Sequence, residues 1–264
     1  MLQLSKGRRL KDITLTSSQT AFRGIGQNEV IRAGGGDDLI YGNRGDDIIS
    51  GNWGDDFISG GEGDDALDGG FGFDQLAGGA GNDVLDGDQD DDLLNGQTGN
   101  DVLMGGLGND VLQGCDDNDL LQGGLGRDTL LGGQGADIYY WSVAHLGPDE
   151  VDRVLDFEQG TDKLAIRGFS YDQSQIVYSG NLAEFDIDRD GQRDLAIQFT
   201  GAPIRLTASD FVTSDLGEAA ATRWISQLSL TLSFSFMIMN DARRGGAAPT
   251  SPDLSIGPPA AIGA

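Results

Sequence analysis

The sequence predicts an all-β protein in which short strands and tight turns stack into a solenoid. A nine-residue unit repeats twelve times, without insertion, over residues 33–140. Its first six residues are rich in Gly, Asn and Asp, which favour turns and positive φ angles. Its last three are β-prone and too short for a helix. Two units therefore make one 18-residue coil with a strand on each side, and stacked coils form two parallel sheets.

The register of the repeat rests on four of its nine positions. The eighth position is aliphatic in eleven units and Tyr139 in the last. Gly opens eleven units and fills the fourth position in ten, with Asp90 and Asp117 as the exceptions. The sixth position is Asp in every unit: Asp38, Asp47, Asp56, Asp65, Asp74, Asp83, Asp92, Asp101, Asp110, Asp119, Asp128 and Asp137.

This register closely resembles the RTX, or hemolysin-type, calcium-binding nonapeptide G-G-x-G-x-D-x-U-x, where U is a large apolar residue. The resemblance covers about two fifths of the chain. It implies a parallel β-roll in which each Ca²⁺ lies between two stacked turns that are two units apart. On one side Asp38 then pairs with Asp56, and the series ends at Asp110 with Asp128. On the other side the pairs run from Asp47 with Asp65 to Asp119 with Asp137, so five pairs per side give a ceiling of ten ions.

Calcium prefers six to eight oxygen ligands, from carboxylates and carbonyls. A Gly-rich turn exposes its carbonyl oxygens, and the Asp at its end supplies charge. The turns at 87–90 and 114–117 depart from the Gly pattern, and we expect them to form, either with ordinary or with weaker sites. We disfavour a merely solubilising role for the Asp residues, since solvated charge needs no nine-residue phase. The expected carbonyl ligands are Gly36, Gly45, Gly54, Gly63, Gly72, Gly81, Gly99, Gly108, Gly126 and Gly135.

Strand periodicity predicts which side chains face the core. Positions six and eight point inward and position seven points outward. One sheet then buries Ile40, Ile58, Leu76, Leu94, Leu112 and Leu130, and the other buries Ile49, Leu67, Leu85, Leu103, Leu121 and Tyr139. The outward position also forms an apolar stripe, which we interpret as exposed strand centres, with a docking surface as the alternative: Ile48, Ala66, Val84, Val102, Leu120 and Ile138.

The charge of the chain limits its partners. Its formal net charge is −26, and residues 33–140 carry 23 Asp, one Glu and two Arg, a net −22. Such a chain should stay expanded unless cations neutralise it. The same field argues against nucleic acid or anionic membrane as a partner. A single cysteine, Cys115, excludes an intramolecular disulfide. We find no cleavable signal peptide pattern and no apolar stretch long enough for a transmembrane helix.

Four segments are expected. Residues 1–32 form an N-terminal cap that ends in a degenerate repeat at 24–32, and residues 33–140 form the roll. Residues 141–212 read as short strands at 151–157, 163–166 and 195–199. They resemble the cap of serralysin-type secreted proteases and RTX lipases in the stretches 156–164, 186–194 and 206–212. Residues 213–264 hold an alternating apolar strand at 225–240 and a disordered Gly/Ala/Pro-rich tail from 243, and are a candidate secretion signal.

A second candidate metal site lies in the cap. Asp186, Asp188, Asp190 and Asp194 are spaced like the start of an EF-hand loop, but Ile197 stands where the completing Glu would be. An acidic hairpin turn is the equal alternative. Catalysis finds no support, since His145 is the only histidine and no G-x-S-x-G motif occurs.

We therefore predict a calcium-binding RTX protein without catalytic activity of its own. The resemblance implies an extracellular location, secreted or on the cell surface, and export by type I secretion machinery. The alternatives are the folding and secretion module of a serralysin-like protease or lipase, or a protein that binds a cell surface or matrix. The sequence names no protein or polysaccharide partner.

Overall fold

The computed structural model describes residues 11–15, 21–142, 150–201 and 203–212. The chain divides into two compact units, 1–224 and 225–264, so every described residue belongs to the first. The expected strand at 225–240, the tail from 243, the candidate secretion signal at 213–264 and His145 lie outside the described residues. They remain predictions.

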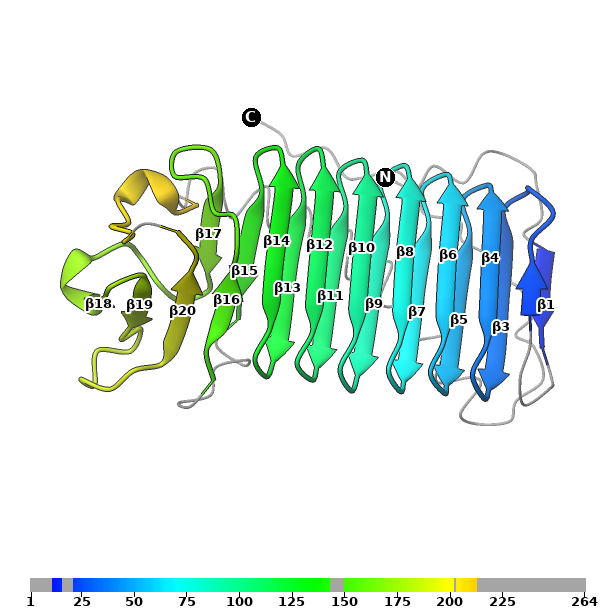
Figure 1. Ribbon diagram of the computed structural model, residues 1–264, viewed down its shortest axis with the longest axis horizontal. Helices are drawn as coiled ribbons and strands as arrows, with labels where there is room; N and C mark the ends of the chain where they lie inside the picture. The colour runs from blue at the N-terminus through cyan, green and yellow to red at the C-terminus, as the bar shows by residue number, and fades with distance from the viewer. Residues whose placement is uncertain (1–10, 16–20, 143–149, 202, 213–264) are drawn as a thin grey trace, which may run out of the picture. The chain divides into compact units, whose positions relative to one another are not determined.

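The repeats form a roll of two parallel sheets, as predicted, with successive strands alternating between them (Figure 1). One sheet contains β1, β3, β5, β7, β9, β11, β13, β15 and β17 in that order, and the other contains the even strands from β2 to β16, followed by β20, β19 and β18. The strands of the roll are β3 (Glu29–Gly35), β4 (Leu39–Arg44), β5 (Ile48–Trp53), β6 (Phe57–Glu62), β7 (Ala66–Phe71), β8 (Gln75–Ala80), β9 (Val84–Gln89), β10 (Leu93–Thr98), β11 (Val102–Leu107), β12 (Val111–Asp116), β13 (Leu120–Leu125), β14 (Thr129–Gln134) and β15 (Ile138–Trp141).

The strands are longer than the sequence predicted. We expected three residues per strand, but β6 runs for six, from position seven of one unit to position three of the next. The parallel ladder continues through the start of the next unit, where Arg44 pairs with Glu62 and the Gly45 N–H donates to the Glu62 carbonyl at 2.8 Å. The tight part of each turn is therefore confined to positions four to six.

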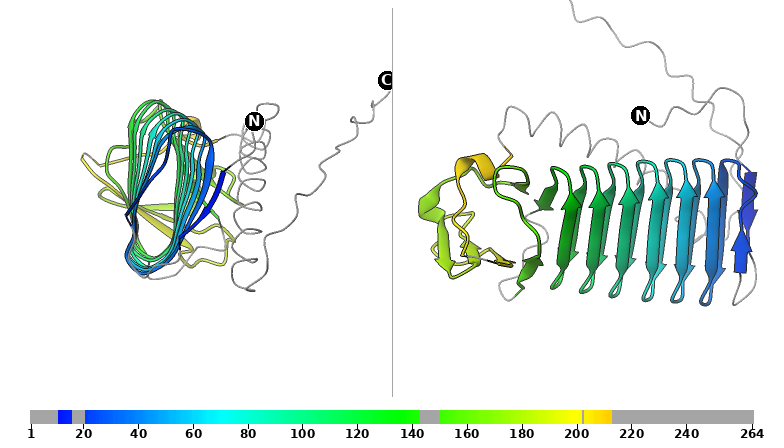
Figure 2. Two further views of the ribbon diagram at one scale, coloured as in Figure 1. Left: turned by 90° about the vertical axis from the view of Figure 1, so that its right-hand side faces the viewer. Right: turned by 45° about the horizontal axis from the view of Figure 1, so that its top comes forward.

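The predicted core is confirmed. All twelve eighth-position side chains are at most 2% exposed, and the buried side chains of both sheets form one continuous cluster along the roll. The sheets face one another across this cluster, as the end-on view in Figure 2 shows. Because two strands per coil supply only one large apolar side chain each, the rest of the interior is filled by the sixth-position carboxylates.

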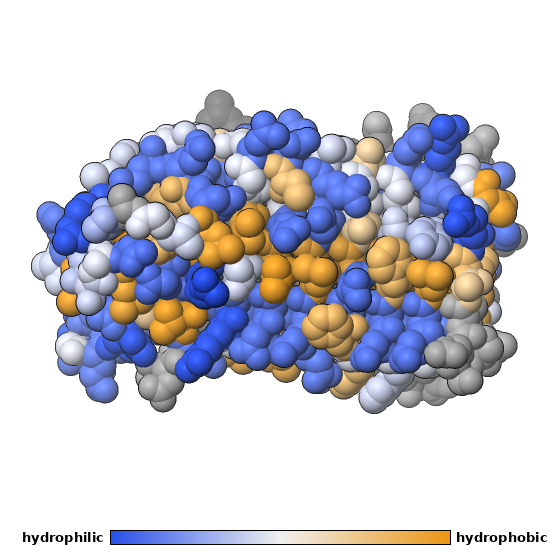
Figure 3. Space-filling view, viewed as in Figure 1, coloured by the Kyte–Doolittle hydropathy of each residue, from blue (hydrophilic) through white to orange (hydrophobic). Residues whose placement is uncertain are grey.

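The outward stripe differs from our expectation in three of its residues. Ala66, Val102 and Leu120 are 8–9% exposed, so they are buried rather than solvated. Each stands in register between two apolar neighbours of the same stripe, as Val102 does between Val84 and Leu120. Figure 3 shows the other face of the roll, formed by the even-numbered strands, where apolar side chains also form a band between polar ones. No helix of the described residues is long and apolar enough to cross a membrane.

Short elements close both ends of the roll. At the N-terminus β1 (Lys11–Thr14) pairs with β3, and β2 (Ala21–Arg23), which the sequence did not predict, pairs with β4. In the cap the predicted strands at 163–166 and 195–199 are confirmed as β17 (Lys163–Ile166) and β20 (Leu195–Phe199). The strand expected at 151–157 is only β16 (Asp152–Val154). The remaining elements are β18 (Ile176–Ser179), β19 (Leu182–Phe185), and the 3₁₀ turns η2 (Gln173–Gln175) and η3 (Ala208–Asp210).

Candidate metal centre

The repeat aspartates form two hydrogen-bonded columns, one at each edge of the roll. The backbone N–H of each Asp donates to Oδ1 of the Asp two units later, at 2.7–3.0 Å. The structure therefore brings together all ten predicted pairs. The first column contains Asp38, Asp56, Asp74, Asp92, Asp110 and Asp128, and the second contains Asp47, Asp65, Asp83, Asp101, Asp119 and Asp137.

The second carboxylate oxygen of each Asp is buried without a donor. All twelve residues are at most 3% exposed. Within the described part of the chain, Oδ2 of every one has no hydrogen-bond partner. A buried polar group without a partner is unfavourable, and a buried charge is more so. Twelve such oxygens in phase indicate a missing positive partner rather than twelve packing defects.

The first glycine of each turn explains where these oxygens point. A Cβ atom placed on Gly51 would collide with Asp56 Oδ2 and would lie 2.8 Å from the carbonyl oxygen of Gly69, in the next coil. The same collision with the Asp of the same unit occurs at every first-position glycine from Gly42 to Gly132. A side chain would thus fill a space that is lined by a carboxylate oxygen and, in several turns, by a carbonyl oxygen of the next coil.

The predicted carbonyl ligands also stack. Each fourth-position residue has a positive φ, from 77° at Asp90 to 142° at Gly108. A Cβ on Gly54 would lie 2.6 Å from the Gly36 carbonyl oxygen, so these carbonyls form a line toward the next coil. The two turns without the usual glycine form as expected, since Asp90 and Asp117 both adopt φ 77°. All ten predicted glycines therefore occupy equivalent turn positions, beside the carboxylate columns.

Burial and crowding raise the pKa of the repeat carboxyls. Loss of hydration is the largest cause, the hydrogen bond from the neighbouring amide lowers the pKa, and the charges of adjacent carboxylates raise it. Two carboxylates about 4.8 Å apart repel by about 3 kcal/mol at an effective dielectric constant of about 20. The pKa is raised to about 6 at Asp101, Asp110 and Asp137, to about 7 at Asp47, Asp56 and Asp65, and to about 8 at Asp74, Asp83, Asp92, Asp119 and Asp128.

The columns extend beyond the repeats, which the sequence did not predict. The Glu29 N–H donates to Asp47 Oδ1 at 2.7 Å, so Glu29 precedes the second column. At the other end the Asp128 and Asp137 N–H groups donate to Oδ1 of Asp152 and Asp162, at 3.0 and 3.1 Å. These partners are 24 and 25 residues apart rather than 18, so the nine-residue phase could not reveal them.

An outer ladder runs beside the carboxylates at position five. The Asn100 N–H and amide both donate to Asn82 Oδ1 at 3.1 Å, and Asn118 repeats the contact with Asn100. Further toward the N-terminus Asn82 donates in the same way to Asp64 Oδ1. These side chains are exposed and hydrogen-bonded, so they join adjacent turns without adding buried charge.

The acidic turn of the cap brings together a different set from the one predicted. Carboxylate oxygens of Asp186, Asp188 and Asp194 lie within 4.8 Å of one another. Asp190 is not in this group, because both of its oxygens accept from Gln192. Asp194 Oδ2 accepts from the N–H groups of Ile187 and Asp188 at 2.6 and 3.2 Å.

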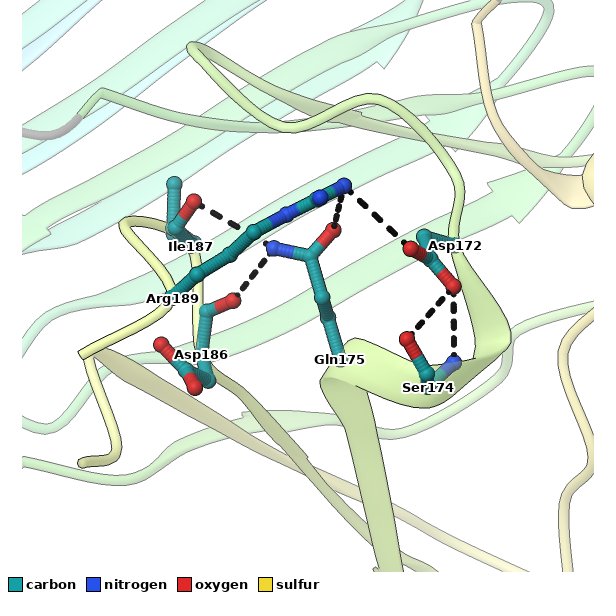
Figure 4. A network of polar contacts seen from close by, with 6 residues as sticks. All are labelled: Asp172, Ser174, Gln175, Asp186, Ile187 and Arg189. Atoms are coloured by element: carbon teal, nitrogen blue, oxygen red, sulfur yellow. Dashed lines mark hydrogen bonds and ion pairs between the residues drawn. The ribbon is translucent and has the colours of Figure 1, made fainter. Parts of the chain in front are cut away.

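The backbone of this acidic turn is fixed from the other side. The Gln175 amide donates to the Asp186 carbonyl at 2.7 Å, and the Asp186 carboxylate points away from it (Figure 4). The guanidinium of Arg189, in the same turn, donates hydrogen bonds to the Asp172 carboxylate and to the Gln175 side-chain oxygen, each at 3.2 Å. The group thus contains three carboxylates, of which Asp188 is exposed. Within this group of three, only Oδ1 of Asp186 is buried without a hydrogen-bond partner.

The oxygens of the two columns suit a hard divalent cation. Carboxylates and backbone carbonyls are the ligands that Ca²⁺ takes, and no nitrogen or sulfur ligand stands among them. The fold and the columns together define a cation-binding parallel β-roll.

Comparison with known families identifies the roll. The model of the RTX calcium-binding nonapeptide repeat (4 copies) matches residues 23–58, 54–76, 59–94, 68–103, 77–112 and 114–140. Residues 23–140 therefore contain repeats of the RTX, or hemolysin-type, calcium-binding nonapeptide.

Several solved structures are similar to this chain, and one of them is a lipase. The extracellular lipase LipA from Serratia marcescens is 17% identical, with a TM-score of 0.36, over 75% of this chain and 40% of the lipase. This chain thus spans well under half of that protein's length. No curated protein matches the chain.

Proposed function

We propose that the roll folds when extracellular Ca²⁺ binds between its stacked turns. The observation that carries this proposal is the set of twelve buried Oδ2 atoms without a donor, in columns where Oδ1 of every repeat aspartate except Asp38 accepts a backbone N–H. The residues that would hold the ions are the twelve repeat aspartates and the carbonyl oxygens of their turns. Bound Ca²⁺ supplies the positive charge that lets adjacent carboxylates remain ionised in the interior.

Calcium binding then becomes folding free energy, since the ions bind the folded chain and not the expanded one. Extracellular modules bind Ca²⁺ with dissociation constants of about 10⁻⁴–10⁻³ M. At the lower calcium concentration inside a cell the charged chain would stay unfolded, which is the state that secretion machinery can pass. We propose that the protein acts outside the cell or on its surface and has no catalytic activity of its own.

Circular dichroism during a calcium titration tests the proposal. The β signal should be absent in excess EDTA, return on addition of millimolar Ca²⁺, and return much less with Mg²⁺, which demands a smaller octahedral site. Native mass spectrometry of the refolded chain should show several bound ions, up to about ten. A roll with an unchanged spectrum in EDTA at pH 8 would refute calcium-dependent folding.

The cap cluster is a separate and weaker proposal. We propose that Asp186, Asp188 and Asp194 hold one further cation at the tip of the β19–β20 connection, in place of the predicted set with Asp190. Its support is the approach of three carboxylates within 4.8 Å and the buried Oδ1 of Asp186.

A further inference from the structure

Three of the four ends of the two columns differ from the interiors in one respect, the exception being Asp38. Glu29, Asp152 and Asp162 all accept or donate the column hydrogen bond, as the repeat aspartates do. Their remaining oxygens, however, meet positive or donating groups of the chain itself. The difference separates positions that need a cation from positions that do not.

At the C-terminal ends the donors are neutral N–H groups. The indole N–H of Trp141 donates to Asp152 Oδ2 at 2.7 Å, and Trp141 is 1% exposed. The backbone N–H of Glu158 donates to Asp162 Oδ2 at 2.8 Å. Neither Asp152 nor Asp162 is among the described residues with a buried, unpartnered oxygen.

At the N-terminal end of the second column the partner is a charge. Glu29 is fully buried, and its Oε1 accepts no hydrogen bond among the described residues. The group that faces this oxygen is the half-exposed ammonium of Lys11 on β1, which forms an ion pair with it at 3.8 Å. Its Oε2 accepts from the Ile25 N–H at 2.8 Å. The turn around it repeats the cradle of the roll, because a Cβ on Gly24 would lie 2.5 Å from Glu29 Oε2 and collide with the Gly42 carbonyl oxygen.

We propose that the Lys11 ammonium takes the place of a metal ion at the N-terminal end of the second column, where Glu29 and the Gly24 turn would otherwise bind one more Ca²⁺. The inference rests on the proposed function, since it assigns the limit of the same ion columns. The inference also explains why position 29 holds an acidic residue. The longer side chain reaches Lys11 while its backbone keeps the column hydrogen bond to Asp47.

Counting bound Ca²⁺ by native mass spectrometry on the full chain tests whether the Lys11 ammonium takes the place of an ion. Lys11→Met should bind one ion more than the wild type, because Glu29 is left buried without a cation. Lys11→Arg keeps the charge and should keep the wild-type count. Arg44→Met is the matched control: it breaks an exposed ion pair, Arg44 Nε to Glu62 Oε2 at 3.0 Å, away from the columns, and should leave the count unchanged.

The double variant Lys11→Met with Glu29→Gln completes the cycle. Removing both charges should restore the wild-type count and the wild-type calcium midpoint. If Lys11→Met fails to fold in saturating calcium, folding of the double variant still supports the inference, and failure of both variants overturns it. A folded Lys11→Met with the wild-type count also overturns it. Failure of the proposed function would look different, since the wild type itself would then show no calcium-dependent β signal.

Discussion

Replacing Asp83 separates the calcium-binding role of a column residue from its role in the turn. Asp83 is 1% exposed and in the middle of the second column. Its Oδ1 accepts from the Asp65 N–H and its own N–H donates to Asp101 Oδ1, both at 2.8 Å. Asp83→Ala removes the carboxylate from the two sites on either side of it. Asn82→Ala, one residue earlier, removes only exposed hydrogen bonds of the outer ladder.

The size of the shift in the calcium midpoint depends on how many ions bind together with folding. A contact with a charged group contributes about 1.5–3 kcal/mol, so the loss from two sites is about 3–6 kcal/mol. If about ten ions bind with folding, each tenfold change in calcium is worth about 14 kcal/mol in total. Asp83→Ala should then raise the calcium midpoint about two- to threefold. Asn82→Ala should change it by less than about 1.2-fold, since surface bonds contribute under about 1 kcal/mol.

Asp83→Asn gives the opposite result when calcium is absent. Loss of hydration and neighbouring carboxylates raise the pKa of Asp83 to about 8. Keeping it ionised in the metal-free roll at pH 8 therefore opposes folding by up to about 5 kcal/mol relative to an unfolded pKa of about 3.9. Asp83→Asn should form more β structure than the wild type in EDTA, yet need more calcium to saturate. Circular dichroism measures both, and equal calcium midpoints for Asp83→Ala and Asn82→Ala would refute the reasoning.

Three further predictions follow from the same geometry. In EDTA the circular-dichroism β signal of the roll should rise as the pH falls from 8 to 5. The pKa values of the folded state, about 7 at Asp65 and about 8 at Asp119, exceed the unfolded value, so the folded state binds more protons and its free energy of unfolding rises. A β signal that does not change with pH would contradict this. In saturating calcium Gly99→Ala should lower the free energy of unfolding by about 1 kcal/mol more than Gly99→Asn does, and so give the lower thermal midpoint. At φ +123° the Gly81 carbonyl leaves no room for a Cβ unless φ shifts to the left-handed value that Asn adopts readily. Equal thermal midpoints for the two variants would refute this prediction. In native mass spectra Asp188→Asn should lose one ion and the exposed neighbour Asp190→Asn none, and equal counts would remove the cap site.

The repeat register predicted the roll because it fixes two periodicities at once. Side chains alternate along a strand, so the phase that buries Leu103 also buries Asp101 two residues earlier. Coils of 18 residues then place every Asp over the one two units away. The predicted core followed from the strand periodicity, and the ten pairs followed from the resemblance to the RTX nonapeptide, which places turns two units apart next to one another.

The features that the sequence did not predict lie where the nine-residue phase ends, or where local hydrogen bonds determine the length of a strand or the position of a carboxylate. Asp152 and Asp162 join the columns after insertions that shift them from the nine-residue spacing. The strands are six residues long because backbone pairing continues over glycines, which have little β-propensity by themselves. In the cap, Asp190 fits the spacing of an EF-hand loop, but both of its carboxylate oxygens accept hydrogen bonds from Gln192 in its own turn, and it does not join the other three carboxylates.

Each column aspartate has two oxygens with opposed effects, and we propose that this division makes the roll dependent on a cation. Oδ1 ties one coil to the next through a backbone N–H, which requires the carboxylate to be inside. Oδ2 then carries charge into the interior beside the next carboxylate. Replacing the column with amides would keep the first bond and abolish the repulsion, giving a roll that folds without calcium. On the proposed function, a carboxylate column would keep the chain expanded without calcium and let it fold once calcium is supplied, a property that a column of amides would lose.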